Sequence, residues 1–141
     1  MAADGPVTVR AADVSPTKVV LFVEDDPAIR LLCRATLERA TVGQAPIARV
    51  VVAPDLQTAR RLVATEQPDV VVLDVRLPDG NGLDLARELG ARSDSARPKV
   101  IIASASVLPA ERTEALAAGA ETFLAKPYRP SELLETIERL L

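Results

Sequence analysis

The chain of 141 residues has no histidine and only one cysteine, Cys33. A single cysteine cannot form an intramolecular disulfide. Without histidine, the usual zinc sites and the Ser-His and Cys-His catalytic arrangements are excluded. Cys33 falls within an expected helix, and we interpret it as a packing residue. Any chemistry of this chain must therefore depend on other side chains.

Long hydrophobic runs and clustered positive charge are also lacking. No apolar run approaches the ~20 residues that a bilayer requires, and no positive region precedes an apolar one at the N-terminus. The net charge is -3, the pI is about 5.0, and no basic cluster is longer than Arg60-Arg61. Because phosphate backbones are bound by basic patches, nucleic acid is not expected as a ligand. We expect a cytoplasmic protein that contacts neither membrane nor nucleic acid.

The composition, 48% hydrophobic and 26% charged, is typical of a globular protein, and the length suits one domain. Residues 1–17 lack sustained periodicity and are expected to be a flexible N-terminal extension, in which 7–10 could add a short edge strand. Residues 18–141 are expected to form the domain. No output domain is expected, because no second domain can be fitted into this length.

Apolar runs alternate with helical patterns along the domain. The expected strands are 18–23, 47–53, 70–74, 99–103 and 122–125. Helices are expected after each strand, and in the first of them the buried face is expected to comprise Ile29, Leu32, Cys33 and Thr36. Alternating units of this length imply parallel strands with right-handed crossovers. The predicted fold is therefore an α/β fold with helices on both faces of one five-stranded sheet.

Polar side chains follow the ends of four of these strands. They are Glu24 and Asp25 after the first strand, Asp74 after the third, Ser104 after the fourth and Lys126 after the fifth. In parallel sheets the ligand site lies outside the carboxyl ends of the strands. Converging carboxylates repel one another and need a cation, and oxygen ligands without histidine or cysteine favour Mg²⁺. A metal ion and a lysine together form the arrangement needed to neutralise phosphoryl oxygens during transfer, and a serine hydroxyl can donate a hydrogen bond to one of these oxygens.

In this order and spacing, the polar residues resemble the receiver domain of two-component response regulators, in its single-domain type. The resemblance includes the turn 77–82, the Gly119-Ala120 pair and Phe123, three residues before Lys126. It implies a doubly wound, flavodoxin-like sheet of strand order 2-1-3-4-5. It also implies transfer of a phosphoryl group from a phosphohistidine, on a histidine kinase or histidine phosphotransfer protein, to Asp74. Such a chain is a signalling phosphoacceptor rather than an enzyme, apart from its own phosphorylation and dephosphorylation.

The resemblance assigns roles residue by residue. Lys126 matches the phosphate-binding lysine, and Ser104 and Phe123 match the hydroxyl and aromatic residues that rearrange after phosphorylation. The implied Mg²⁺ ligands are Glu24, Asp25, Asp74 and the main-chain carbonyl of Arg76. A downstream protein, or a second copy of the chain, is expected to bind the face formed by the fourth helix, fifth strand and fifth helix.

Two positions are expected to tune the lifetime of the phosphoryl group: Arg76, two residues after Asp74, and Ser106, two residues after Ser104. We hypothesise that Arg76 pairs with Glu24 or Asp25 when no metal is bound. The third acidic residue, Asp26, stands where a helix begins and is interpreted as its cap.

Other functions remain open from the residues alone. A haloacid-dehalogenase-type phosphatase also uses a strand-end aspartate with Ser, Lys and Mg²⁺, but it expects a second aspartate where this chain has Arg76. A flavodoxin-like FMN protein would need a phosphate-cradling loop where the chain has three acidic residues. An adaptor could keep the receiver shape and work without phosphorylation.

Overall fold

The structure is a computed structural model, and it describes residues 18–42, 45–93, 97–105 and 108–141. Three expectations fall outside this part of the chain: the flexible extension 1–17, its possible strand 7–10, and the tuning residue Ser106.

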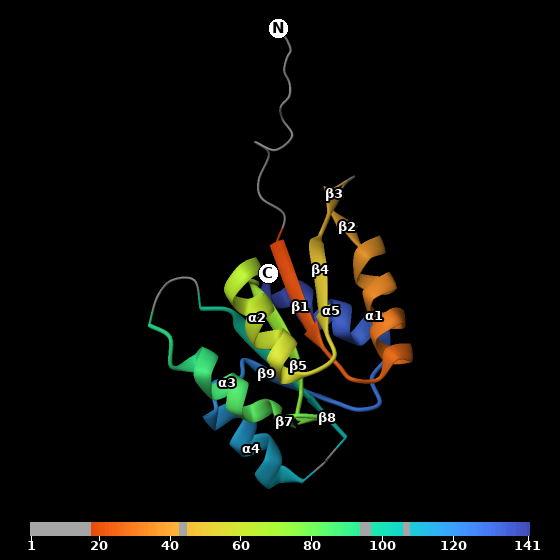
Figure 1. The fold of residues 1–141 in the computed structure, drawn as a ribbon. Coiled ribbons are helices and arrows are strands. Elements are labelled where there is room, and N and C mark those ends of the chain that lie inside the picture. Colours follow the sequence, from red (N-terminus) through yellow and green to blue (C-terminus); the bar gives the residue numbers. More distant parts are fainter. Residues whose placement is uncertain (1–17, 43–44, 94–96, 106–107) are drawn as a thin grey trace, which may run out of the picture.

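A parallel five-stranded sheet forms the centre of the described domain (Figure 1). Its strands are β1 (Lys18–Val23), β4 (Ala48–Ala53), β5 (Val70–Asp74), β8 (Lys99–Ser104) and β9 (Thr122–Ala125). They lie in the order β4-β1-β5-β8-β9, and every neighbouring pair is parallel. Counted in chain order, this is 2-1-3-4-5, so the predicted topology is confirmed.

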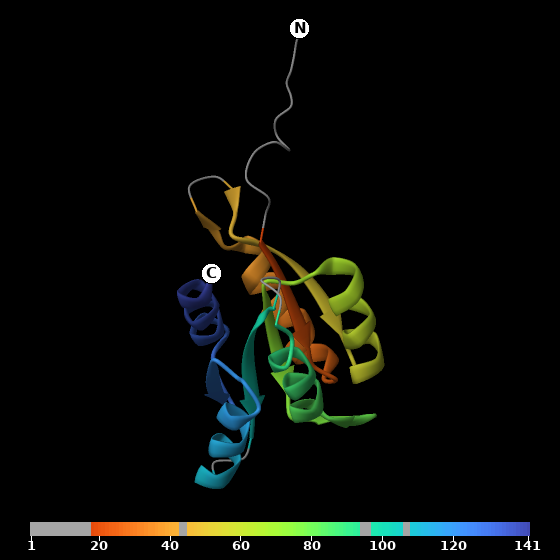
Figure 2. The same ribbon diagram turned by 90° about the vertical axis from the view of Figure 1, so that its left-hand side faces the viewer.

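Helices cover both faces of the sheet, as the view in Figure 2 also shows. They are α1 (Pro27–Arg39), α2 (Leu56–Glu66), α3 (Gly82–Gly90), α4 (Pro109–Ala117) and α5 (Pro130–Leu140). Alternate residues along a strand point to opposite faces, so Leu21 and Leu73 pack with α2, α3 and α4, whereas Phe22 and Val72 pack with α1 and α5. The continuous apolar runs seen in the sequence therefore fill two cores at once.

The helices begin where polar side chains can bind their free N–H groups. Asp26 accepts hydrogen bonds from the N–H groups of Ala28 and Ile29, so its predicted capping role is confirmed. Asp55 caps α2 and Asn81 caps α3 in the same manner. These caps fix the direction in which the chain leaves the carboxyl edge of the sheet.

The structure corrects several details. Leu32, expected on the buried face of α1, is 55% exposed, and Leu37 is buried there with Cys33. The second sheet strand begins at Ala48 rather than at 47, and the fourth reaches Ser104. Two short hairpins were not expected: β2 (Thr41–Val42) with β3 (Ala45–Pro46), and β6 (Arg76–Leu77) with β7 (Gly80–Asn81).

Among the described helices, none is long and apolar enough to cross a membrane.

Candidate functional site

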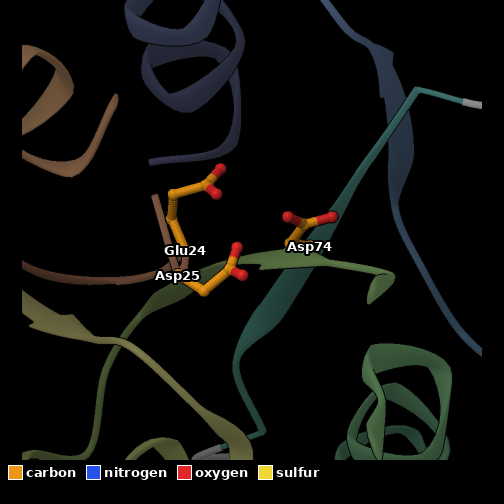
Figure 3. Close-up of side chains that lie close together, drawn as sticks. All are labelled: Glu24, Asp25 and Asp74. Carbon is orange, nitrogen blue, oxygen red and sulfur yellow. The ribbon is translucent and has the colours of Figure 1, made fainter. Parts of the chain in front are cut away.

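Three carboxylates converge at the carboxyl edge of the sheet (Figure 3). Glu24 and Asp25 follow β1, and Asp74 is the last residue of β5, which pairs with β1. One oxygen atom from each carboxylate lies within 4.8 Å of the other two. Glu24 and Asp74 are buried, whereas Asp25 is exposed. The fold thus brings together the acidic residues that the sequence singled out.

Lys126 joins two of these carboxylates. Its Nζ donates to Glu24 Oε1 at 2.8 Å and to Asp74 Oδ2 at 2.9 Å. The lysine follows β9, on the far side of β8 from β5, so its long side chain must reach across to the acidic group. Burial on its own lowers the pKa of Lys126, but the hydrogen bonds to both carboxylates outweigh it and leave the pKa above its usual value. Lys126 therefore stays charged in this site.

Glu24 is the most buried of the acidic residues, with 2% of its surface exposed. Burial raises the pKa of Glu24, and the hydrogen bond from Lys126 only partly offsets that effect. Its Oε2 also accepts the N–H of Asp26, and Arg30 donates to its main-chain oxygen. These contacts fix the carboxylate in place and hold the chain where β1 passes into α1.

The turn after Asp74 is clamped on both sides. Asp79 accepts the N–H groups of Leu56 and Gln57 at the start of α2, and this hydrogen bonding lowers the pKa of Asp79. On the other side, a Cβ at Gly82 would lie 2.0 Å from the main-chain oxygen of Asp74, so only glycine fits there. The β6–β7 hairpin is thereby held in a fixed position beside Asp74.

The structure locates Arg76 in this hairpin. Its main-chain N–H donates to Asp74 Oδ1 at 3.3 Å, and its side chain is exposed. The hypothesised ion pair of Arg76 with Glu24 or Asp25 is not formed among the described residues, and Glu24 pairs with Lys126 instead. The roles of Arg76 as metal ligand and tuning residue stay predictions.

Ser104 and Phe123 both contact α4. The Ser104 hydroxyl, which is buried, donates to Glu111 Oε1 at 2.9 Å. The Arg112 guanidinium carbon lies 5.1 Å from the centre of the Phe123 ring, a cation–π arrangement. Ser104 and Phe123, which the resemblance assigns to the rearrangement after phosphorylation, therefore both contact the first turns of α4.

A cavity of about 490 Å³ opens over Asp74, and its walls include the three carboxylates, Arg76, Ser104 and Lys126. Four acidic side chains line the cavity against two basic ones, Arg76 and Lys126, and this excess of negative charge favours a cation. Opposite ligands of Mg²⁺ stand about 4.2 Å apart, since each metal–oxygen distance is about 2.1 Å. One oxygen atom from each of the three carboxylates lies within 4.8 Å of the others, a spacing close to that of ligands around such an ion.

Sequence reasoning missed three side chains that build this site. Glu111 and Arg112 are two of several charged residues on α4, and no pattern distinguishes them from a solvated helix face. Arg30 lies on α1, one turn beyond its cap. In the sequence, Arg30 stands four residues after Asp26. This spacing indicates a helix, and it does not indicate the hydrogen bond from Arg30 to the main-chain oxygen of Glu24.

With the fold and the site in view, comparison with known proteins gives one family. The family model described as "Response regulator receiver domain" matches residues 20–138. The chain belongs to this family of two-component signalling domains.

The curated relatives are response regulators. The KDP operon transcriptional regulatory protein KdpE of Escherichia coli is 41% identical over 114 residues, which cover 81% of this chain and 47% of that protein. Response regulator MprA of Mycolicibacterium vanbaalenii is 37% identical over 122 residues, covering 86% of this chain and 49% of that protein. The chain thus spans about half the length of the curated relatives it matches.

Solved receiver domains share the fold. The receiver domain of the Francisella response regulator 1452 has a TM-score of 0.76 and 28% identity, covering 88% of this chain and 96% of that structure. The chemotaxis response regulator CheY4 of Vibrio cholerae has a TM-score of 0.77 and 27% identity, covering 89% of this chain and all of that structure. The flavodoxin-like fold class predicted from the sequence is confirmed.

Proposed function

We propose that the chain accepts a phosphoryl group on Asp74 from a phosphohistidine of a histidine kinase or histidine phosphotransfer protein. The observation that carries this proposal is the bridge from Lys126 to Asp74 and Glu24, beside the open cavity. A carboxylate that is to be phosphorylated needs a free oxygen and nearby positive charge for the incoming phosphoryl oxygens. Lys126 supplies the positive charge at Asp74 Oδ2, and the cavity gives access to the carboxylate, whose Oδ1 holds only the long 3.3 Å bond from the Arg76 N–H.

The metal in this proposal is Mg²⁺, held by Glu24, Asp25, Asp74 and the main-chain carbonyl of Arg76. When bound, it would neutralise charge on the phosphoryl oxygens during transfer. The protein's own contribution is positional: strands β1 and β5 hold the carboxylates, and the clamped β6–β7 hairpin holds Arg76. Arg76 and Ser106 are proposed to tune how long the phosphoryl group survives.

A protein donor, rather than a small molecule, is supported by the surface beside the cavity. An apolar groove of about 390 Å³ adjoins it and shares Ile29, Ala105 and Lys126 with it. Leu32, exposed on α1, also lines this groove, and Leu31 beside it is 71% exposed. A protein that carries phosphohistidine could cover these apolar side chains while it delivers the phosphoryl group to Asp74.

We propose that the signal leaves through protein contacts of α4, β9 and α5, either to a downstream protein or to a second copy of the chain. β9 is one of the two edge strands of the sheet, and its residues are partly buried or exposed. Neither nucleic acid nor membrane is expected to bind this domain itself, the expected location is the cytoplasm, and no turnover of a small substrate is expected.

The test is incubation with Mg²⁺ and acetyl phosphate, followed by intact mass measurement of the wild type and of Asp74→Asn. One phosphoryl adduct, present in the wild type and lost in the variant, is the expected result. Absence of the adduct would favour a phosphorylation-independent adaptor. Multiple turnover of phosphate esters would favour the phosphatase alternative.

The tuning role of Arg76 has its own test. Arg76→Ala should change the Mg²⁺ affinity or the rate at which the adduct is lost, because this residue stands beside both the metal ligands and the acceptor. If both quantities equal those of the wild type, the tuning role is wrong.

A further inference from the structure

Helix α4 binds the Ser104 hydroxyl through Glu111, at 2.9 Å. The bond links the end of β8 to the first turn of α4, across a connection of a few residues. Its acceptor is a carboxylate, and hydrogen bonds to charged groups are stronger than those between neutral groups. Neither the family's site nor the sequence pattern assigns a role to Glu111.

A hydroxyl group has a single hydrogen to donate. While the Ser104 hydroxyl donates to Glu111, it cannot donate to a phosphoryl oxygen on Asp74. Both Ser104 and Asp74 line the same cavity, and they end neighbouring strands of the sheet. The two acceptors therefore compete for one proton donor.

We propose that Glu111 is a positioning residue that holds the Ser104 hydroxyl on α4 and so opposes its binding to a phosphoryl group on Asp74. This inference rests on the proposed function, and it adds a residue that regulates the binding of the phosphoryl group on Asp74. Phosphorylation draws the hydroxyl away from Glu111 and releases the first turn of α4. By reciprocity, whatever weakens the Ser104–Glu111 bond strengthens the binding of the phosphoryl group.

The packing of α4 explains why this bond matters. Ala115 is the only buried residue in the helix, and the N-cap position is occupied by Leu108, whose side chain has no group that can cap. Leu116 is half exposed. With so little of the helix buried, the bond from Ser104 to Glu111 and the contact of Arg112 with Phe123 are expected to matter for the position of α4.

Arg112, the residue after Glu111, links the first turns of α4 to Phe123 as Glu111 links them to Ser104. It follows Glu111 in the helix and lies over the Phe123 ring, which is partly buried against the core beneath α2, α3 and α4. A movement of the first turns of α4 would therefore move the side chain that covers this ring. Ser104 and Phe123 are linked through one helical turn.

Glu114 provides a matched control. It is an exposed glutamate on the same helix, and it pairs with Arg87 on α3 rather than with Ser104. Glu114→Ala removes the same charge and the same side-chain length from α4. Glu111→Ala also removes a negative charge from the first turn, where it favours the helix dipole. A Ser104→Ala background separates that general effect from the loss of the hydrogen bond.

The experiment is calorimetric titration with beryllium fluoride, a phosphoryl analogue, in excess Mg²⁺, on the full chain. Glu111→Ala should bind about tenfold more tightly than the wild type, equivalent to about 1.4 kcal/mol. Glu114→Ala should bind as the wild type does, and Glu111→Ala should have no effect when Ser104 is replaced by alanine. Equal affinity of Glu111→Ala and wild type, or the same gain in the Ser104→Ala background, would overturn the inference. If the wild type binds no beryllium fluoride and forms no phosphoryl adduct, the proposed function itself fails.

Discussion

The acceptor strand and helix α4 are held in opposite ways. All five residues of β5 are buried, and Asp74 at its end is bound by Lys126 and by the N–H of Arg76. In α4 only Ala115 is buried, and surface side chains connect the helix to Ser104, Phe123 and Arg87. The difference suggests that the site separates two tasks. In the proposed function, the acceptor stands on a fully buried strand, and the response belongs to the helix with the fewest buried residues.

The largest expected difference between these regions is in packing energy. Leu73→Ala should lower the free energy of unfolding by about 3 to 4 kcal/mol, because Leu73 is fully buried in β5 and its loss leaves a cavity. Leu116→Ala, the same substitution on the exposed side of α4, should cost less than about 0.5 kcal/mol. Urea unfolding of both variants measures the two values. Similar decreases in the free energy of unfolding for the two variants would contradict the difference in packing between β5 and α4.

The second prediction concerns the ion pairs at the acceptor. Lys126→Met should lower the free energy of unfolding by about 2 to 3 kcal/mol at pH 7, because two buried carboxylates lose their cation. The control Lys99→Met, an exposed lysine that donates to the main-chain oxygen of Leu140, should stay within about 0.5 kcal/mol.

The decrease in the free energy of unfolding caused by Lys126→Met should also depend on pH. Burial raises the pKa of Glu24, so this carboxyl takes up a proton more readily than in the unfolded chain. A protonated Glu24 needs no cation, so the gap between wild type and variant should narrow as the pH falls toward that pKa. A gap that stays constant down to pH 4 would contradict the assignment.

A smaller effect is expected at Tyr128, whose hydroxyl accepts from the Cys33 thiol of α1 and which is partly buried against the core beneath α1 and α5. Tyr128 is the only tyrosine of the chain, and burial raises its pKa. The unfolded chain therefore releases this proton near pH 10 while the folded chain keeps it, so the folded state should lose stability as the pH rises above about 10. Ultraviolet titration should show Tyr128 ionising later in the folded protein than in denaturant. Tyr128→Phe should remove this part of the alkaline loss, and equal titration curves would contradict the prediction.

The smallest expected effect lies on α4. Arg112→Ala should cost about 0.5 to 1 kcal/mol, because it removes one exposed cation–π contact with Phe123. Amide hydrogen exchange should become faster in α4 and stay unchanged in β5, since local opening costs less where packing is light. Arg139→Ala, an exposed arginine on α5, serves as the control. Faster amide exchange throughout the sheet in Arg112→Ala would show that α4 does not open independently of the sheet.

The strands could be predicted because each is a continuous apolar run that both faces of the sheet must bury. The predicted bounds of β1, β5 and β9 agree with the structure, and the polar residue after each run marks the edge where the site forms. Glu24, Asp25, Asp74 and Lys126 converge as expected, because parallel strands bring their carboxyl ends to one edge.

Contacts that depend on loop geometry could not be predicted. The hairpins β2–β3 and β6–β7 have strands of two residues, too short for any periodic pattern. Leu32 has the spacing of a buried residue, yet it is exposed on α1. The sequence could not show this, because hydrophobicity alone does not tell which of several neighbouring apolar positions of a helix faces the core. The Ser104–Glu111 bond depends on the path from β8 to α4, which the sequence does not specify.

The most direct test of this division of tasks is hydrogen exchange, resolved by peptide, before and after treatment with acetyl phosphate and Mg²⁺. In the wild type, we predict that phosphorylation of Asp74 makes exchange in α4 several-fold faster and leaves β5 unchanged. Asp74→Asn should show neither change. An equal change in α4 and β5, or the same change in Asp74→Asn, would contradict the account.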